Sequence, residues 1–247
     1  MPEVTVIIPY YKKIDYIEKT IESVLNQTHQ DFEIILIYDD IKQDDFRILK
    51  KKYNTNNKII IVNNEKNLGA GISRNKGIKL SKGKFIAFID SDDIWLPSKL
   101  ESQLRFIKQN NYDFVFCDYK KIISKNKTIE VVNPMKKITY NDLIKSCDIG
   151  LSTVLIRKNV VNENLFPATK TKEDFIAWLK LTKKNINAYN LNDTLVIWNS
   201  VQGSLSSNLI QKIIDGFRVY YFYENFNIFK SIYYLFLLSF NSIKKKF

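Results

Sequence analysis

Short apolar runs and amphipathic stretches alternate along the first half of the chain. Runs rich in β-branched and aromatic residues cover 4–9, 32–38, 58–62, 84–89 and 112–119. Between them, apolar residues recur at helical spacing over 16–27, 44–54, 71–81 and 97–110. The strand-like runs do not alternate cleanly between apolar and polar positions, which is typical of a parallel sheet covered by helices on both faces. The pattern therefore predicts a doubly wound α/β fold with right-handed crossovers.

The second half of the chain is less regular. It predicts strands over 128–132 and 152–158, helices over 139–147 and 171–185, and a hairpin over 188–199. No repeat or low-complexity linker separates the two halves. We therefore expect one domain over residues 1–210, followed by a C-terminal amphipathic helical tail over 211–247.

Polar residues follow each of the first four strand-like runs. In parallel sheets of this kind, ligands bind beyond the carboxyl ends of the strands, which share one edge. The residues at these ends are Pro9, Tyr10 and Tyr11; Asp39 and Asp40; the stretch 67–74; and Asp90, Ser91, Asp92 and Asp93. The sequence therefore predicts a binding site along this edge.

The chain carries a strong basic excess. Lys and Arg number 38 against 26 Asp and Glu, which gives a formal net charge of +12. Such an excess favours anionic partners such as nucleic acid, phosphorylated small molecules or an anionic membrane, and scattered lysines also serve solubility. No basic-aromatic nucleic-acid motif is present, so we expect no nucleic-acid partner. A glycine-rich phosphate loop after the first strand is also absent, which argues against a nucleotidyltransferase.

The stretch "FIAFIDSDDIW" (85–95) places an acidic cluster at the end of an apolar run, which is unexpected in a basic chain. Asp90 and Asp92 are two residues apart, so extended backbone points both side chains to the same side. Two adjacent carboxylates repel each other unless a cation or proton lies between them. Mg²⁺ or Mn²⁺ suits such a pair, with phosphate oxygens and water completing the shell. The cluster therefore predicts a metal-diphosphate site; the alternative is an acidic start to the following helix.

The ordered motifs "PYY", "YDD", "SRN" and "DSD" resemble those of family-2 nucleotide-sugar glycosyltransferases with the GT-A fold, densely over residues 3–118 and more thinly to about 207. The resemblance implies that Pro9, Tyr10 and Tyr11 line the base and ribose pocket. It implies that one carboxylate of Asp39 and Asp40 binds the base and that Arg74 assists nucleotide binding. Asp90, Ser91 and Asp92 match the D-x-D motif, in which Asp92 ligates the metal and Asp90 contacts the ribose or the metal shell.

The stretch "KEDFIAWLKL" resembles the family segment that carries the catalytic base. Sugar transfer to a hydroxyl needs removal of the acceptor proton, which a carboxylate facing the sugar can perform. The resemblance implies that Asp174 is the general base, that Glu173 positions it or the acceptor, and that transfer inverts the anomeric centre. It also implies a nucleotide-diphosphate donor, for which we prefer a UDP-sugar, and a glycan or lipid-linked acceptor. The alternative for both residues is an acidic helix start.

Two departures from the family pattern bear on the donor site. Ile41 and Lys42 stand where Gly-Ser usually follows the acidic pair, and Asn199 and Val201 stand where an arginine and a histidine are usual. They leave open an alternative function, a nucleotide-sugar-binding protein that has lost catalysis.

The C-terminal tail is aromatic and apolar and carries lysines at 244–246. It predicts either an amphipathic segment in the membrane interface or helices that pack on the domain or on a second copy. No window reaches the roughly 20 apolar residues that span a membrane. Cys117 and Cys147 do not imply a disulfide framework, and the N-terminal sequence lacks the features of a secretory signal. We therefore expect a cytoplasmic protein, with peripheral contact at the inner face of the membrane through the tail.

Overall fold

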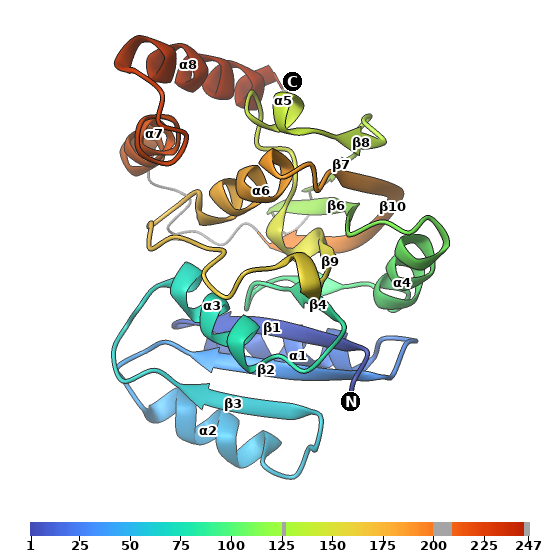
Figure 1. The fold of residues 1–247 in the computed structure, drawn as a ribbon. Coiled ribbons are helices and arrows are strands. Elements are labelled where there is room, and N and C mark those ends of the chain that lie inside the picture. Colours follow the sequence, from blue (N-terminus) through green and yellow to red (C-terminus); the bar gives the residue numbers. More distant parts are fainter. Residues whose placement is uncertain (125–126, 200–208, 245–247) are drawn as a thin grey trace.

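The structure, a computed structural model, describes residues 1–124, 127–199 and 209–244 and confirms the expected α/β architecture (Figure 1). The elements of the first half are β1 (Val4–Tyr10), α1 (Ile14–Leu25), β2 (Phe32–Tyr38), α2 (Asp44–Tyr53), β3 (Ile59–Asn63), α3 (Ala70–Leu80), β4 (Phe85–Phe88), β5 (Ile94–Trp95) and α4 (Lys99–Gln109). The second half contains β6 (Phe114–Ser124), β7 (Lys127–Val131), β8 (Lys137–Ile138), α5 (Tyr140–Leu143), η1 (Leu151–Thr153), β9 (Leu155–Arg157), η2 (Lys158–Val160), α6 (Glu173–Lys183) and β10 (Ala188–Asn199). Helices α7 (Leu209–Arg218) and α8 (Ile228–Lys244), joined through the π-helical turn η4 (Val219–Tyr223), complete the described chain.

One sheet runs through the molecule in the strand order β3-β2-β1-β4-β9-β6-β10-β5. Strand β1 pairs in parallel with β2 and β4, and β2 pairs in parallel with β3. The carboxyl ends of these four strands therefore meet at one edge, as the sequence predicts. The second half adds both orientations, since β9 is antiparallel to β4 and β6 whereas β10 is parallel to β6.

Two hydrophobic cores cover the two faces of the sheet. Val6 and Ile8 of β1 pack into the first core together with the apolar faces of α1, α2 and α4. The neighbouring Ile7 packs into the second core, where α3, α5, α6 and the C-terminal helices contribute. Figure 1 shows α3 and α6 on the near face and α1 behind the sheet. Burial on both faces explains why the strands read as unbroken apolar runs.

Strand β10 corrects the hairpin expected over 188–199. The stretch "NLND" has the composition of a turn, but the strand stays paired with β6 on both sides of it. Its register shifts between Asn190 and Thr194, and Asn192 adopts a left-handed φ of 59°. Asn190 fills the irregularity by donating from Nδ2 to Oδ1 of Asp118 (3.0 Å). The turn-forming residues thus build a β-bulge rather than a chain reversal.

Two further expectations need correction in the second half. The helix expected over 139–147 is confined to α5, where Thr139 forms the expected N-terminal cap with Asp142. The strand expected over 152–158 begins as the 3₁₀ turn η1 and becomes extended only in β9. The turn brings Ser152 against the acidic loop after β4.

The C-terminal helices lie on the side of the molecule away from β3, next to α5 and α6 (Figure 1). Val219, Tyr220 and Leu238 enter the second core. Glu224 accepts from the Tyr140 hydroxyl (2.5 Å) and from Lys183 Nζ (2.9 Å), which ties the helices to α5 and α6. No helix in the described ranges is long and apolar enough to cross a membrane. The division of the chain at residue 210 stays a prediction.

Lys99 is a buried cation in the first core. Its ammonium lies 3.9 Å from the centroid of the Trp95 ring and donates to Oε1 of Gln103 (2.8 Å). Burial lowers the pKa of Lys99 to about 8 from its ordinary 10.5. The cation is therefore held by a ring face and neutral acceptors, and it keeps its charge at neutral pH at a cost to stability.

Replacing Lys99 by methionine is expected to remove a pH dependence of stability. The unfolded chain holds this proton up to about pH 10.5 and the folded chain releases it near pH 8, so wild-type stability should rise across this window. The difference between the two pKa values corresponds to about 3 kcal/mol. Urea unfolding of wild type and Lys99→Met at several pH values measures it. Lys108→Met, at an exposed position of the same helix, is the control; parallel profiles for Lys99→Met and wild type would contradict the expectation.

Candidate active site

The acidic pair after β2 holds the loop that leads into α3. The Asp39 carboxylate accepts from the backbone N–H groups of Leu68 and Gly69 (both 2.8 Å) and from Nδ2 of Asn64 (2.7 Å). Gly69 has a φ of +85°, a conformation that suits glycine. Asp40 is buried beside it and accepts from the backbone N–H of Lys42 (3.2 Å). Asp39 is therefore committed to the loop, and Asp40 keeps more acceptor capacity for a ligand.

The three residues at the end of β1 differ in accessibility. Pro9 and Tyr10 are buried, and the Tyr10 hydroxyl donates to Oδ2 of Asp45 (2.5 Å) while its ring stacks on Tyr38. Tyr11 is 43% exposed at the edge of the sheet. Of the three, Tyr11 alone offers its side chain to solution, and Tyr10 supports the edge from beneath.

Arg74 joins the acidic loop after β4 to the start of α6. Its two terminal nitrogens bind Oδ1 of Asp90 (2.7 Å) and Oε1 of Glu173 (2.8 Å). Its side chain is 4% exposed, and its buried Nε has no hydrogen-bond partner among the described residues. Burial alone would lower the pKa of Arg74, but the two carboxylates outweigh that effect and raise it. The guanidinium therefore stays charged and fixes both carboxylates.

Lys13, at the start of α1, binds Asp92, the second carboxylate of the expected D-x-D motif. Its Nζ lies 2.8 Å from Oδ2 of Asp92, and the two side chains are 21% and 15% exposed. Burial raises the pKa of Asp92, against the opposing effect of the Lys13 ammonium. Each of the two carboxylates expected to bind metal thus already has one cationic partner, because Arg74 holds Asp90.

Ser152 of η1 and Asn199 of β10 hold the acidic loop in shape. The Ser152 hydroxyl donates to Oδ2 of Asp93 (2.5 Å) and accepts from the backbone N–H of Asp90 (3.1 Å). Asn199 donates from Nδ2 to the carbonyl of Asp92 (2.6 Å) and from its backbone N–H to Oδ1 of Asp93 (3.2 Å). Burial, assisted by the charge of Asp90, raises the pKa of Asp93 well above its usual range. Asp93 therefore acts inside the loop and does not face a ligand.

This geometry tests the alternative explanation of the acidic cluster. Helix α4 begins at Lys99, after β5, and the acidic residue of its first turn is Glu101. Asp90 and Asp92 consequently lie outside α4, the helix whose dipole was considered as the reason for these acidic residues. Ser91, between them, is buried.

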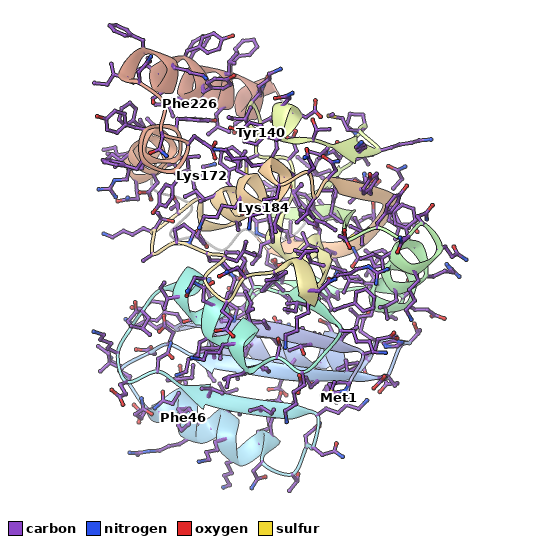
Figure 2. The ribbon with its side chains drawn as sticks, viewed as in Figure 1. Met1, Phe46, Tyr140, Lys172, Lys184 and Phe226 are labelled. Carbon is purple, nitrogen blue, oxygen red and sulfur yellow. The ribbon has the colours of Figure 1, made fainter. Side chains whose placement is uncertain are left out.

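Helix α6 presents Glu173 and Asp174 at its first turn. Lys172, labelled in Figure 2, precedes them with a left-handed φ of 68°, which costs a non-glycine residue about 1 kcal/mol. Further along α6, the centroid of the Trp178 ring lies 5.1 Å from that of Phe114 and 6.4 Å from that of Phe88, at the end of β4. Ring packing therefore fixes α6 relative to the strand that leads into the acidic loop.

The electrostatic surroundings distinguish Asp174 from Glu173. Burial raises the pKa of Asp174, against the opposing charge of Lys172. Burial also raises the pKa of Glu173, but Arg74 opposes that effect at 2.8 Å. The charges of Asp90 and Arg74 act on Asp174 as well, so the four groups form one cluster. Asp174 thus has a raised proton affinity, and it has no ion pair with Arg74 because Arg74 binds Glu173 instead.

The residues present fit a divalent ion only with a further ligand. Within the described ranges, no three His, Cys, Asp or Glu side chains are grouped to hold a metal. Asp90 and Asp92 supply two carboxylates, which suits Mg²⁺ or Mn²⁺ when phosphate oxygens and water complete the shell. Asp90 and Asp92 would therefore fit an ion that draws its remaining ligands from outside the protein, and they do not form a closed protein cage.

The comparisons with known proteins agree with this fold. Residues 5–164 match Glycosyl transferase family 2. TuaG of Bacillus subtilis, a glycosyltransferase named for teichuronic acid biosynthesis, is 33% identical over 247 residues, covering 99% of this chain and 98% of the relative. WfgD of Escherichia coli, a UDP-Glc:α-D-GlcNAc-diphosphoundecaprenol β-1,3-glucosyltransferase, is 36% identical over 211 residues, covering 85% and 82%. The chain belongs to glycosyl transferase family 2 and is a glycosyltransferase.

Two solved structures share the fold. S. aureus TarS 1–349 in complex with UDP-GlcNAc has a TM-score of 0.71 at 23% identity, over 89% of this chain and 64% of that chain. The Pyrobaculum calidifontis mannosyltransferase PcManGT, in complex with GDP-Man and Mn²⁺, has a TM-score of 0.71 at 15% identity, over 95% and 70%. The expected GT-A fold is thereby confirmed.

Sequence reasoning missed Lys13 and Ser152. For Lys13 there was a weak indication in the sequence that it belongs to the site, since it lies two residues after the "PYY" motif at the carboxyl end of β1. Ser152 gave none, because its partner Asp93 is 59 residues away. The expected departure at Asn199 proves to be a structural contact with the acidic loop, and Val201 lies outside the described residues.

Proposed function

We propose that this glycosyltransferase moves a sugar from a nucleoside-diphosphate donor, a UDP-sugar, to a hydroxyl of a glycan or lipid-linked saccharide, with inversion and with Asp174 as general base. The observation that carries the proposal is the Arg74 bridge, which holds the donor-side Asp90 and the helix bearing Asp174 in one cluster. WfgD supports the donor and acceptor classes, since its name specifies a UDP-sugar and a diphosphoundecaprenol-linked saccharide. TuaG supports a role in polysaccharide biosynthesis, since its name specifies teichuronic acid.

The donor nucleotide would bind along the edge formed by β1, β2 and β4. Tyr11 presents its ring there, and Asp40 has acceptor capacity for an imide N–H of a uracil-type base. Asp90, Ser91 and Asp92 would face the ribose and the diphosphate. Four further residues would support this surface from the protein interior, because each is buried and packed or bonded within the protein: Pro9, Tyr10, Asp39 and Arg74.

Asp92, together with Asp90, would hold a divalent ion, Mn²⁺ or Mg²⁺. When bound, such an ion neutralises the charge that develops on the leaving diphosphate. The Mn²⁺ in PcManGT supports this assignment for a protein of the same fold.

Asp174 would accept the proton of the acceptor hydroxyl as the new glycosidic bond forms. Its raised pKa suits this task, because a base of higher proton affinity removes the proton more effectively. Glu173, held by Arg74, would position the start of α6 and thereby the base. Attack from the face opposite the nucleotide would invert the anomeric centre, through an oxocarbenium-like transition state.

Calorimetric titration with UDP, GDP, CDP and dTDP, each with and without Mn²⁺, tests the donor site. We expect wild type to bind UDP most tightly, with affinity raised by Mn²⁺, and Asp92→Asn to lose at least tenfold of the Mn²⁺-dependent affinity. Asp113→Asn, at a half-exposed carboxylate paired with Arg157, is the matched control. If no nucleotide binds under any condition, the proposed function is wrong.

One observation favours a second candidate, a nucleotide-sugar-binding protein without catalysis. Asn199 stands where relatives of this sequence type were expected to carry a basic residue, and its side chain is committed to the Asp92 carbonyl. Retained UDP binding with no transfer to any acceptor would support this candidate. Measurable transfer that Asp174→Asn abolishes would exclude it.

The C-terminal helices would place the enzyme on the cytoplasmic face of a membrane. The exposed large apolar residues of α7, η4 and α8 are here called the apolar C-terminal surface: Ile210, Ile213, Ile214, Tyr221, Phe222, Ile228, Phe229, Ile232, Tyr233, Phe236 and Phe240. Figure 2 shows ring side chains extending from α8 away from the rest of the protein. Aromatic residues on an amphipathic helix suit the headgroup region of a bilayer. The side chains of the lysines at 244–246 lie outside the described residues.

Replacing Phe229 and Phe236 by serine is expected to reduce binding to anionic vesicles at least tenfold. The two rings are 83% and 66% exposed, so the loss of apolar area affects docking and not the core. Co-sedimentation with phosphatidylglycerol–phosphatidylcholine vesicles measures the effect, and Ile48→Ser, at an exposed position of α2, is the control. Unchanged vesicle binding would exclude this surface, and a concentration-dependent dimer that the double variant disrupts would assign it to a second copy.

A further inference from the structure

Lys13 is anchored at its backbone, and its partly exposed side chain ends in an ion pair. Its carbonyl accepts from the backbone N–H groups of Tyr16 (3.0 Å) and Ile17 (2.9 Å) at the first turn of α1. Its ammonium lies 5.6 Å from the centroid of the Tyr16 ring and 2.8 Å from Oδ2 of Asp92. The side chain is 21% exposed, so water reaches it. The backbone therefore fixes where the side chain begins, and the ion pair fixes where it ends.

The two cations at the D-x-D motif differ in how firmly they are held. Arg74 is 4% exposed and binds two carboxylates at once. A movement away from Asp90 would therefore also break its ion pair with Glu173 and leave the Glu173 charge unpaired. Lys13 is more exposed and contacts one carboxylate through a flexible stem. Of the two, Lys13 is the cation that can be displaced.

We infer that Lys13 is a counter-ion that occupies Asp92 until the donor diphosphate arrives, so that the protein binds a divalent ion together with the diphosphate and only weakly before it. The inference rests on the proposed metal-assisted transfer. Lys13 neutralises the carboxylate in the free enzyme, and it opposes a bare metal ion both by holding the ligand oxygen and by like-charge repulsion. The negative charge of a diphosphate offsets that repulsion and offers the displaced ammonium a new partner.

The composition of the site supports this order. Asp90 and Asp92 together offer a divalent ion four carboxylate oxygens, of which Arg74 and Lys13 already engage one each. The described residues place no third metal-binding side chain beside them. Mg²⁺ and Mn²⁺ sites of this type draw their remaining ligands from substrate phosphates and water. Lys13 is thus positioned to make metal binding dependent on the nucleotide.

Mn²⁺ binding with and without UDP, followed by the electron paramagnetic resonance of free aqueous Mn²⁺, tests the inference on wild type and Lys13→Met. We expect Lys13→Met to bind Mn²⁺ alone about tenfold more tightly than wild type, the factor that corresponds to an ion pair worth about 1.4 kcal/mol. We also expect UDP to raise the Mn²⁺ affinity of wild type by a larger factor than that of the variant, since linkage between two ligands is reciprocal. Lys19→Met removes the same charge from an exposed position of α1 and should match wild type.

Two unfavourable results have different meanings. If wild type binds Mn²⁺ and UDP cooperatively but Lys13→Met binds Mn²⁺ alone no better than wild type, the role of Lys13 is overturned and the proposed function stands. If wild type shows no cooperativity between UDP and Mn²⁺, the proposed metal-diphosphate site fails and the inference fails with it. Unfolding curves for both lysine variants exclude a folding defect as the cause.

Discussion

Replacing Asp174 by asparagine is expected to lower the rate of sugar transfer by roughly 10²- to 10⁴-fold, the usual contribution of a general base. Donor binding should be retained, because the described structure shows no hydrogen bond or ion pair between Asp174 and the residues proposed to face the nucleotide. Its Oδ1 accepts from the backbone N–H of Phe175 (2.7 Å), which an asparagine oxygen can also do. The fold should therefore persist. Turnover of a UDP-sugar and calorimetric UDP affinity, measured on the same preparation, separate the two effects.

Glu173→Gln is the matched comparison for this variant. It is also isosteric and adjacent, but it removes the partner of Arg74 instead of the proposed base. We expect a smaller loss of kcat for it than for Asp174→Asn, together with lower stability. A larger loss of kcat for Glu173→Gln, with stability unchanged, would exchange the roles of the two residues.

The pH profile gives an independent check on the base. A general base works only when deprotonated, so activity should fall as the pH decreases through its pKa. Burial raises the pKa of Asp174, and the acidic limb of kcat/KM should therefore lie above about 3.9, the ordinary value for aspartate. The limb should be absent from the residual activity of Asp174→Asn.

Replacing Arg74 by methionine is expected to have the largest effect on stability, a loss of roughly 3–5 kcal/mol. The change leaves Asp90 and Glu173 without the buried guanidinium that both of them bind. Transfer activity should fall as well, because the acidic loop and α6 lose their shared contact. Arg74→Lys should recover part of the stability and little of the activity, since one ammonium cannot reproduce the forked geometry. Urea unfolding and turnover measure the two losses.

A double variant shows whether the uncompensated charge is the cause. Adding Glu173→Gln to Arg74→Met removes one of the two unpaired carboxylates and should restore part of the lost stability. Arg157→Met is the control, because Arg157 is 27% exposed and binds the backbone carbonyl of Tyr112 and the half-exposed carboxylate of Asp113. Equal losses for Arg74→Met and Arg157→Met would contradict the bridging role.

The order of the elements in the first half could be predicted because its causes are local. Strands such as β2 can be recognised from the sequence because they are apolar runs buried on both faces, and the run at 32–38 gives the bounds of β2. The parallel connections then bring Asp39 and Asp90 to one edge without any knowledge of their contacts. Turn composition was misleading at β10, where pairing with β6 outweighed the preference of Asn192 for a turn.

The contacts that organise the site could not be predicted, because they join residues distant in the chain. Arg74 and Glu173 are 99 residues apart, and Ser152 and Asp93 are 59 apart. Spacing shows that a carboxylate or an arginine lies at the right edge, but not which carboxylate the arginine binds. Arg74 was therefore expected to contact the nucleotide, whereas its terminal nitrogens bind two carboxylates of the protein. A contact of Arg74 with the nucleotide stays a prediction.

The Arg74 bridge also limits how enzymes of this kind can exchange parts. Under the proposed function, the residues up to the acidic loop form a first module, for the donor, and the residues from α6 onward form a second, which carries the base. The guanidinium belongs to the first module and one of its carboxylates to the second. A chimaera joined anywhere between them inherits the two halves of a buried ion pair from different parents. We therefore expect such a chimaera to keep its stability only where both parents have an arginine and a glutamate at these two positions.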